Sequence, residues 1–128
     1  MLHHLTLWVP DLDRALGPWT WLLGSLGYRL EPGPAETIAL FRDGSGFAFV
    51  IEESSDMVPG MLYSRFRPGL NHVAFRLDSW DVLGDIVRDT GDHGWSVLPV
   101  DRHPIAGEAR VGYLEDSDGF EVELVAPA

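Results

Sequence analysis

Two histidines and two glutamates recur at similar spacings along this chain of 128 residues. His4 and His72 lie 68 residues apart, and Glu52 and Glu123 lie 71 residues apart. Each histidine stands near the start of an expected strand, and each glutamate stands near the end of one. Imidazole and carboxylate groups are ordinary ligands of divalent transition metals. Converging on one cavity, these four groups would form a suitable ligand set for Ni, Zn, Fe, Co or Mn.

Side chains alternate between the two faces of a strand, and this alternation separates the candidates from their neighbours. The expected first strand places His4 and Trp8 on one face, opposite an apolar face suited to lie under a helix. His3 and Glu53, the neighbouring rivals, fall on the opposite face. We therefore take His4 and Glu52 as candidate ligands and Trp8 as a candidate cavity residue.

Three further residues are candidates for lining the same cavity. Arg76 shares a strand face with the second histidine, and Glu121 shares one with Glu123. A cavity position and a solvated strand end are both open for Glu121. His103, in the loop 101–107, is a candidate proton shuttle because histidine titrates near neutral pH, with a plain surface loop as the alternative.

The elements that must position these residues form two copies of one pattern. Each copy has the order β-α-β-β-β, and such internal repetition fixes the architecture. We expect a first module over 1–53, a linker over 54–69 and a second module over 70–128. Together they predict a single α+β domain with a cavity between curved mixed sheets. The expected strands cover about 2–9, 28–31, 36–42 and 46–52, then 70–77, 95–100, 110–115 and 120–125.

Helix boundaries are indicated by residues that favour helix ends. Asp11 is expected to cap the first helix, and Asp78 or Ser79 the second. Pro18 lies inside the first apolar stripe, which predicts a kink or a late helix start. Gly27 is expected to end that helix.

Composition excludes several classes of protein. The chain has nine basic residues, all arginine, against twenty acidic ones, so its net charge is −11 and nucleic acid is not an expected partner. It has no cysteine, which excludes a disulfide scaffold. No apolar run approaches the ~20 residues of a membrane span, and no signal peptide is recognised, so we expect a cytoplasmic protein. The acidity suits a cationic small molecule or serves solubility.

Three motifs resemble the vicinal oxygen chelate superfamily, the glyoxalase/bleomycin resistance protein/dioxygenase group. They are HLTLWVPDL at 4–12, GLNHVAF at 69–75 and LEDSDGFEVEL at 114–124. The resemblance implies paired βαβββ modules, a metal held by the sheets and commonly a homodimer. It places the metal ligands on His4, Glu52, His72 and Glu123. This complete set is of the glyoxalase I type, whereas extradiol dioxygenases need two histidines and one glutamate.

The resemblance implies a metal-dependent lyase or isomerase acting on a small oxygenated substrate that chelates the metal. Glu52 or Glu123 would be the base that takes a proton from carbon. Bacterial glyoxalase I has an arginine for glutathione near the position of Trp8 and an asparagine near that of Asp56, so we expect no strict glutathione dependence. The alternatives are an antibiotic-binding protein of the bleomycin-resistance type, or a related dioxygenase or epimerase.

Overall fold

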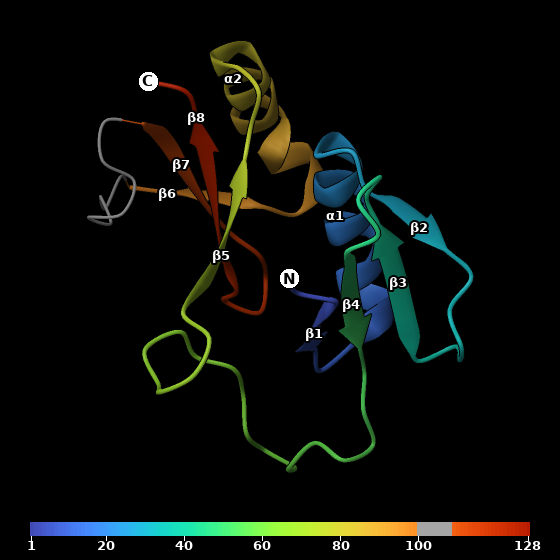
Figure 1. Cartoon of the computed structure of the whole chain (residues 1–128). Coiled ribbons are helices and arrows are strands. Elements are labelled where there is room, and N and C mark those ends of the chain that lie inside the picture. The colour runs from blue at the N-terminus through green and yellow to red at the C-terminus, as the bar shows by residue number, and fades with distance from the viewer. Residues whose placement is uncertain (100–108) are drawn as a thin grey trace. The chain divides into compact units, whose positions relative to one another are not determined.

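The computed structural model describes residues 1–99 and 109–128 (Figure 1). The chain divides into two compact units, Met1–Leu62 and Tyr63–Ala128. Each unit has a strand, a helix and then three further strands, as the repeat predicts. The boundary between the units falls inside the segment 54–69 that the sequence marks as a linker.

The observed elements match the expected ones, and most strands are slightly shorter at their ends. The first unit contains β1 (His4–Trp8), α1 (Leu12–Ser25), β2 (Arg29–Glu31), β3 (Ile38–Arg42) and β4 (Ala48–Glu52). The second contains β5 (His72–Arg76), α2 (Trp80–Asp89), the 3-10 helix η1 (Thr90–His93), β6 (Ser96–Leu98), β7 (Arg110–Glu115) and β8 (Glu121–Ala126).

The sheet of the first unit has the strand order β1-β4-β3-β2. Strand β1 is parallel to β4, and the other pairs are antiparallel. Helix α1 packs its apolar stripe on this sheet, and Trp19 stacks on Phe49 of β4 with ring centroids 5.4 Å apart. Each large apolar side chain buried in this way contributes about 1.5–3 kcal/mol. The buried residues of α1 are Leu12, Ala15, Trp19, Leu22 and Leu23.

The start of α1 is fixed by two carboxylates. Asp11 accepts a hydrogen bond from the backbone N–H of Arg14 at 3.1 Å, which confirms the predicted cap. Glu53 accepts one from the backbone N–H of Leu12 at 2.9 Å. The helix begins at Leu12 and continues through Pro18, so a late start is wrong. Burial of the apolar stripe outweighs the proline, since each large buried side chain contributes about 1.5–3 kcal/mol and a proline inside a helix costs about 3 kcal/mol.

The second unit repeats this arrangement with the strand order β5-β8-β7-β6, and β5 is parallel to β8. Ser79 rather than Asp78 caps α2, accepting a hydrogen bond from Val82 N–H at 3.4 Å. Helix α2 approaches β7 closely at Gly112, where an added Cβ would lie 3.0 Å from the Leu83 side chain. In the described part of the chain, no helix has the length and apolar character needed to span a membrane.

Strand pairing corrects one inference drawn from the repeat. In the second unit, Ala74 is the residue two positions after His72, and it lies opposite Glu123. In the first unit, Thr6 is the residue two positions after His4, and it lies opposite Val50. Glu52 lies two residues farther along β4. The prediction that the two glutamates occupy equivalent positions is therefore wrong. It compared their places near strand ends, whereas hydrogen-bonded pairing decides equivalence, and β8 continues past Glu123 to Ala126.

Candidate functional site

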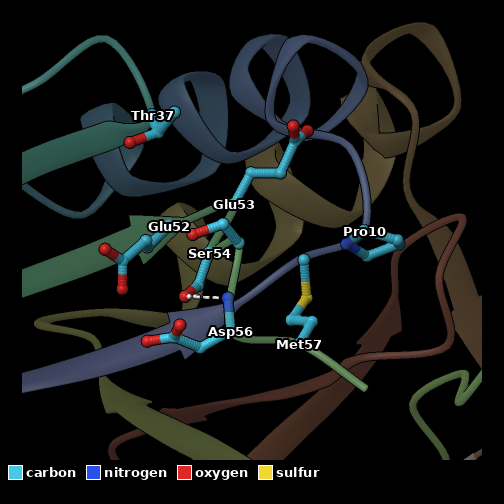
Figure 2. Close-up of a pocket in the computed structure, with 8 residues that line it drawn as sticks. Pro10, Thr37, Glu52, Glu53, Ser54, Asp56 and Met57 are labelled. Carbon is cyan, nitrogen blue, oxygen red and sulfur yellow. Dashed lines mark hydrogen bonds between the residues drawn. The ribbon is translucent and has the colours of Figure 1, made fainter. Parts of the chain in front are cut away.

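The first unit contains a pocket of about 490 Å³ beside the carboxyl ends of β1 and β4 (Figure 2). Its lining is mostly polar and carries three carboxylates. Ser54 accepts a hydrogen bond from the backbone N–H of Asp56 at 3.1 Å, which ties down the turn after β4. The lining residues are Pro10, Thr37, Glu52, Glu53, Ser54, Ser55, Asp56 and Met57.

Glu52 is held at this pocket by Trp8. The two residues lie opposite each other on parallel strands, and Trp8 Nε1 donates a hydrogen bond to Glu52 Oε1 at 2.8 Å. The indole is nevertheless 46% exposed. A short bond from an aromatic donor therefore orients a carboxylate at the pocket without covering the ring.

His4 lies at the other end of β1, opposite Ala48. Trp8 is four positions farther along the strand, which corresponds to about 13 Å at ~3.3 Å per residue. His4 Nδ1 lies 2.8 Å from Nδ1 of His3. Within the first unit, His4 and Glu52 thus occupy opposite ends of their strand pair.

The second unit brings its two candidate ligands into contact. Nε2 of His72 lies 3.1 Å from Oε2 of Glu123, and the Glu123 side chain is only 1% exposed. Tyr113, on β7 opposite Glu123, donates a hydrogen bond from its hydroxyl to Oε1 at 3.4 Å. Glu121 lies farther away, with Oε2 at 3.9 Å from Nδ1 of His72. The parallel pairing of β5 with β8 and the antiparallel pairing of β8 with β7 create this row.

The Glu123 carboxylate is left partly unsatisfied. The contact between its Oε2 and His72 is close but not aligned as a hydrogen bond, and Oε2 has no hydrogen-bond partner among the described residues. A buried carboxylate is costly unless hydrogen bonds or an opposite charge compensate it. A divalent cation between a neutral imidazole and this carboxylate would supply that charge. The pair therefore fits a metal, although nowhere in the described ranges are three or more His, Asp or Glu groups arranged to hold one.

The segment before β5 supports His72 from its other side. Asn71 Oδ1 lies 2.8 Å from Nδ1 of His72, and Asn71 Nδ2 donates to the backbone carbonyl of Arg65 at 2.8 Å. The Arg65 guanidinium in turn pairs with Glu115 of β7 at 2.9 Å. Tyr63 stacks on Phe120 with ring centroids 3.8 Å apart. Burial raises the pKa of the Tyr63 hydroxyl, which keeps it a donor.

The remaining predicted residues have mixed outcomes. Arg76 ends β5 and is exposed, on the strand face that carries His72 by alternation. His103 lies outside the described residues. Sequence reasoning missed Tyr113 and Asn71 as neighbours of the candidate ligands. The signal for Asn71 was its place directly before His72, and that for Tyr113 was a polar hydroxyl on an otherwise apolar strand.

Comparisons with known proteins agree with this architecture. The sequence profile of the Glyoxalase/Bleomycin resistance protein/Dioxygenase superfamily matches residues 3–113. The uncharacterised protein YqjT of Bacillus subtilis (strain 168) is 35% identical over 129 residues, covering 99% of each chain. A crystal structure of a glyoxalase-like protein from Bacillus halodurans superimposes with a TM-score of 0.86 at 32% identity, covering 99% of this chain and 96% of the other.

A more distant likeness is to the fosfomycin resistance protein FosX from Listeria monocytogenes. A variant of FosX crystallised with Mn(II) and 1S,2S-dihydroxypropylphosphonic acid has a TM-score of 0.67 at 23% identity. The match covers 100% of this chain and 90% of the FosX chain. At this identity the likeness concerns the fold.

Proposed function

Since the chain belongs to the glyoxalase/bleomycin resistance protein/dioxygenase superfamily, we propose that it is a metal-dependent enzyme of the glyoxalase type. Its substrate is a small molecule that offers two neighbouring oxygens to the metal. The observation that carries the proposal is the His72–Glu123 pair, in which a buried carboxylate oxygen lacks a hydrogen bond beside an imidazole nitrogen.

His72 and Glu123 would hold the metal through Nε2 and Oε2. His4 and Glu52 stay the predicted further ligands, contributed by the same chain or by a second copy in a homodimer. Because they lie at opposite ends of the β1–β4 pair, one metal takes at most one of them from a given chain. Nitrogen and carboxylate donors suit Ni, Zn, Fe, Co or Mn, and a structural relative was crystallised with Mn(II). When bound, such a metal supplies Lewis acidity that polarises a substrate carbonyl.

Glu52 is the better placed of the two glutamates to take a proton from substrate. A general base must reach the reacting carbon, and Glu52 lines the pocket, whereas Glu123 is buried between His72 and Tyr113. The bond from Trp8 fixes Oε1 of Glu52, so Oε2 is the oxygen we assign to proton transfer. His72 orients the ligand set and takes no part in proton transfer.

The pocket disfavours a strictly glutathione-dependent reaction. Its three carboxylates, from Glu52, Glu53 and Asp56, would repel the negative charges of that tripeptide. The indole of Trp8 cannot make the paired hydrogen bonds that an arginine makes to a carboxylate. We therefore assign a substrate that is neutral or cationic away from its chelating oxygens.

Metal analysis of single variants tests the proposal. The purified protein is stripped with a chelator and reloaded with Ni, Co, Zn or Mn, and bound metal is measured by elemental analysis. We expect His72→Ala to lower metal affinity at least ~10-fold, because a chelate that loses one ligand is severely weakened. His93→Ala, a histidine of η1 in the same unit, is the control and should bind as the wild type does. Equal metal binding by His72→Ala would contradict the proposal.

A second candidate function is sequestration of an antibiotic, favoured by the half-exposed indole of Trp8 beside acidic side chains. Aromatic faces and carboxylates together suit planar or cationic ligands. Calorimetric titration of metal-free protein with a cationic glycopeptide antibiotic distinguishes the two functions. Tight binding without metal would favour sequestration, and metal-dependent turnover of a small dicarbonyl would favour the enzyme.

A further inference from the structure

We propose that Asn71 is a positioning residue that sets the tautomer of His72, so that Nε2 rather than Nδ1 is the unprotonated nitrogen facing Glu123. The inference rests on the proposed metal-dependent function. It adds that Asn71 selects which nitrogen of His72 coordinates the metal. Asn71 itself touches neither metal nor substrate in this assignment. Its effect is transmitted through the imidazole ring.

The orientation of the Asn71 amide follows from its partner on the far side. The backbone carbonyl of Arg65 can only accept a hydrogen bond, so the group of Asn71 that faces it at 2.8 Å is the NH₂. The amide oxygen then faces His72, with Oδ1 at 2.8 Å from Nδ1. Because an amide oxygen is only an acceptor, the hydrogen in this contact belongs to the imidazole.

A proton on Nδ1 determines the state of the rest of the ring. In the neutral imidazole only one nitrogen carries a hydrogen, so Nε2 presents its lone pair. Oε2 of Glu121 lies 3.9 Å from Nδ1, beyond hydrogen-bond distance, so the acceptor that Nδ1 contacts is Oδ1 of Asn71. Unprotonated Nε2 thus lies 3.1 Å from Oε2 of Glu123.

Two acceptor atoms at this distance repel each other unless a cation lies between them. Oε2 of Glu123 has no hydrogen-bond partner among the described residues, so no donor in that part of the chain relieves the repulsion. The tautomer set by Asn71 therefore makes Nε2 of His72 and Oε2 of Glu123 two electron-pair donors that suit a shared cation. Histidine ligands in metal sites are commonly fixed in this way through their second nitrogen.

The segment 63–71 holds Asn71 in place from within the second unit. Arg65, whose carbonyl receives the Asn71 amide, is anchored to Glu115 of β7 and to the backbone carbonyl of Gly119. Tyr63 donates its hydroxyl to the carbonyl of Leu70 at 2.6 Å. These contacts make Asn71, whose Oδ1 accepts from His72, part of an ordered segment, which reduces the entropy lost when the imidazole is oriented.

The tautomer can be read directly in the metal-free protein. Long-range ¹H–¹⁵N spectra at about pH 8 distinguish Nδ1–H from Nε2–H in neutral histidine. Comparison with a His72→Gln variant identifies the His72 signals among the five histidines. We expect wild-type His72 to carry its proton on Nδ1. We expect Asn71→Ala to lose this preference and to bind Zn about 10–100-fold more weakly, the usual effect of removing a group that orients a ligand.

Two variants separate positioning from a general structural effect. Asn71→Asp keeps an acceptor oxygen for Nδ1 and should retain the tautomer. Ser79→Ala removes a hydrogen bond at the start of α2 in the same unit without touching His72 or the segment 63–71, and it should retain both tautomer and Zn affinity.

A wild-type His72 protonated on Nε2, or an Asn71→Ala variant with the wild-type tautomer, would overturn the inference. Because the spectra are recorded without metal, a failure of wild-type protein to bind any divalent metal would refute the proposed function separately.

Discussion

Replacing Glu123 with glutamine is expected to change the stability of the metal-free protein and its metal affinity in opposite directions. The side chain is 1% exposed, and its Oε2 atom has no hydrogen-bond partner among the described residues. A glutamine of the same shape keeps an acceptor for the Tyr113 hydroxyl. It also places an NH₂ group opposite the lone pair of His72 Nε2, where the carboxylate oxygen now lies at 3.1 Å.

The size of the stability change follows from these contacts. Leaving a buried polar atom unsatisfied costs about 1–3 kcal/mol, and glutamine removes that cost together with the buried charge. The metal-free Glu123→Gln protein should therefore gain about 1–3 kcal/mol, which corresponds to a rise in Tm of roughly 3–10 °C for a chain of this length. Its metal affinity should fall at least ~10-fold, because an anionic ligand is lost.

Urea denaturation of chelator-treated protein measures the first quantity, and calorimetric titration with Zn or Mn measures the second. Tyr113→Phe provides a contrast of opposite sign, since it removes the hydroxyl that donates to Oε1 of Glu123 and should destabilise the metal-free protein by about 1–2 kcal/mol. A Glu123→Gln protein that is less stable without metal, or that binds metal as tightly as the wild type, would refute the reasoning.

Three other changes have definite expected outcomes. Trp8→Phe removes the 2.8 Å bond that orients Glu52 and should lower kcat/KM about 10–100-fold, because a misplaced base loses its alignment with substrate. The bond is exposed, so the urea midpoint should change little. Turnover of the methylglyoxal–glutathione adduct should be weak and should rise in Asp56→Asn; a wild-type kcat/KM near ~10⁶ M⁻¹s⁻¹ would contradict this. Gly112→Ala should lower the free energy of unfolding measured in urea by about 1–3 kcal/mol. Gly84→Ala should not lower it, because the added Cβ meets nothing within 4 Å.

Local signals in the sequence predicted the elements well. Asp11 precedes an apolar stripe, and its carboxylate does cap α1. The repeated β-α-β-β-β order was visible because both copies keep the same succession of strand and helix periodicities. Each of these features depends on residues within a few positions of one another, so no knowledge of long-range pairing was needed.

The candidate site was less predictable because it depends on register and on contacts between distant segments. Alternation of side chains assigned Glu52 and Glu123 each to one face of its strand. A shift of two residues keeps a side chain on the same face but gives it a different partner on the neighbouring strand. Alternation alone therefore left the equivalence of the two glutamates undetermined. The contact of Asn71 with the Arg65 carbonyl arises from the path of a segment without regular structure. Nothing in residue type or spacing indicates such a path.

The division of the chain between Leu62 and Tyr63 has an evolutionary consequence. Residues 54–57 line the pocket of the first unit, whereas residues 63–71 orient a histidine of the second. Mutations that reshape the pocket therefore act on a different folding unit from the buried Tyr113–Glu123–His72 row. Substitutions at the pocket can therefore accumulate in one unit while the costly buried carboxylate of the other stays unchanged.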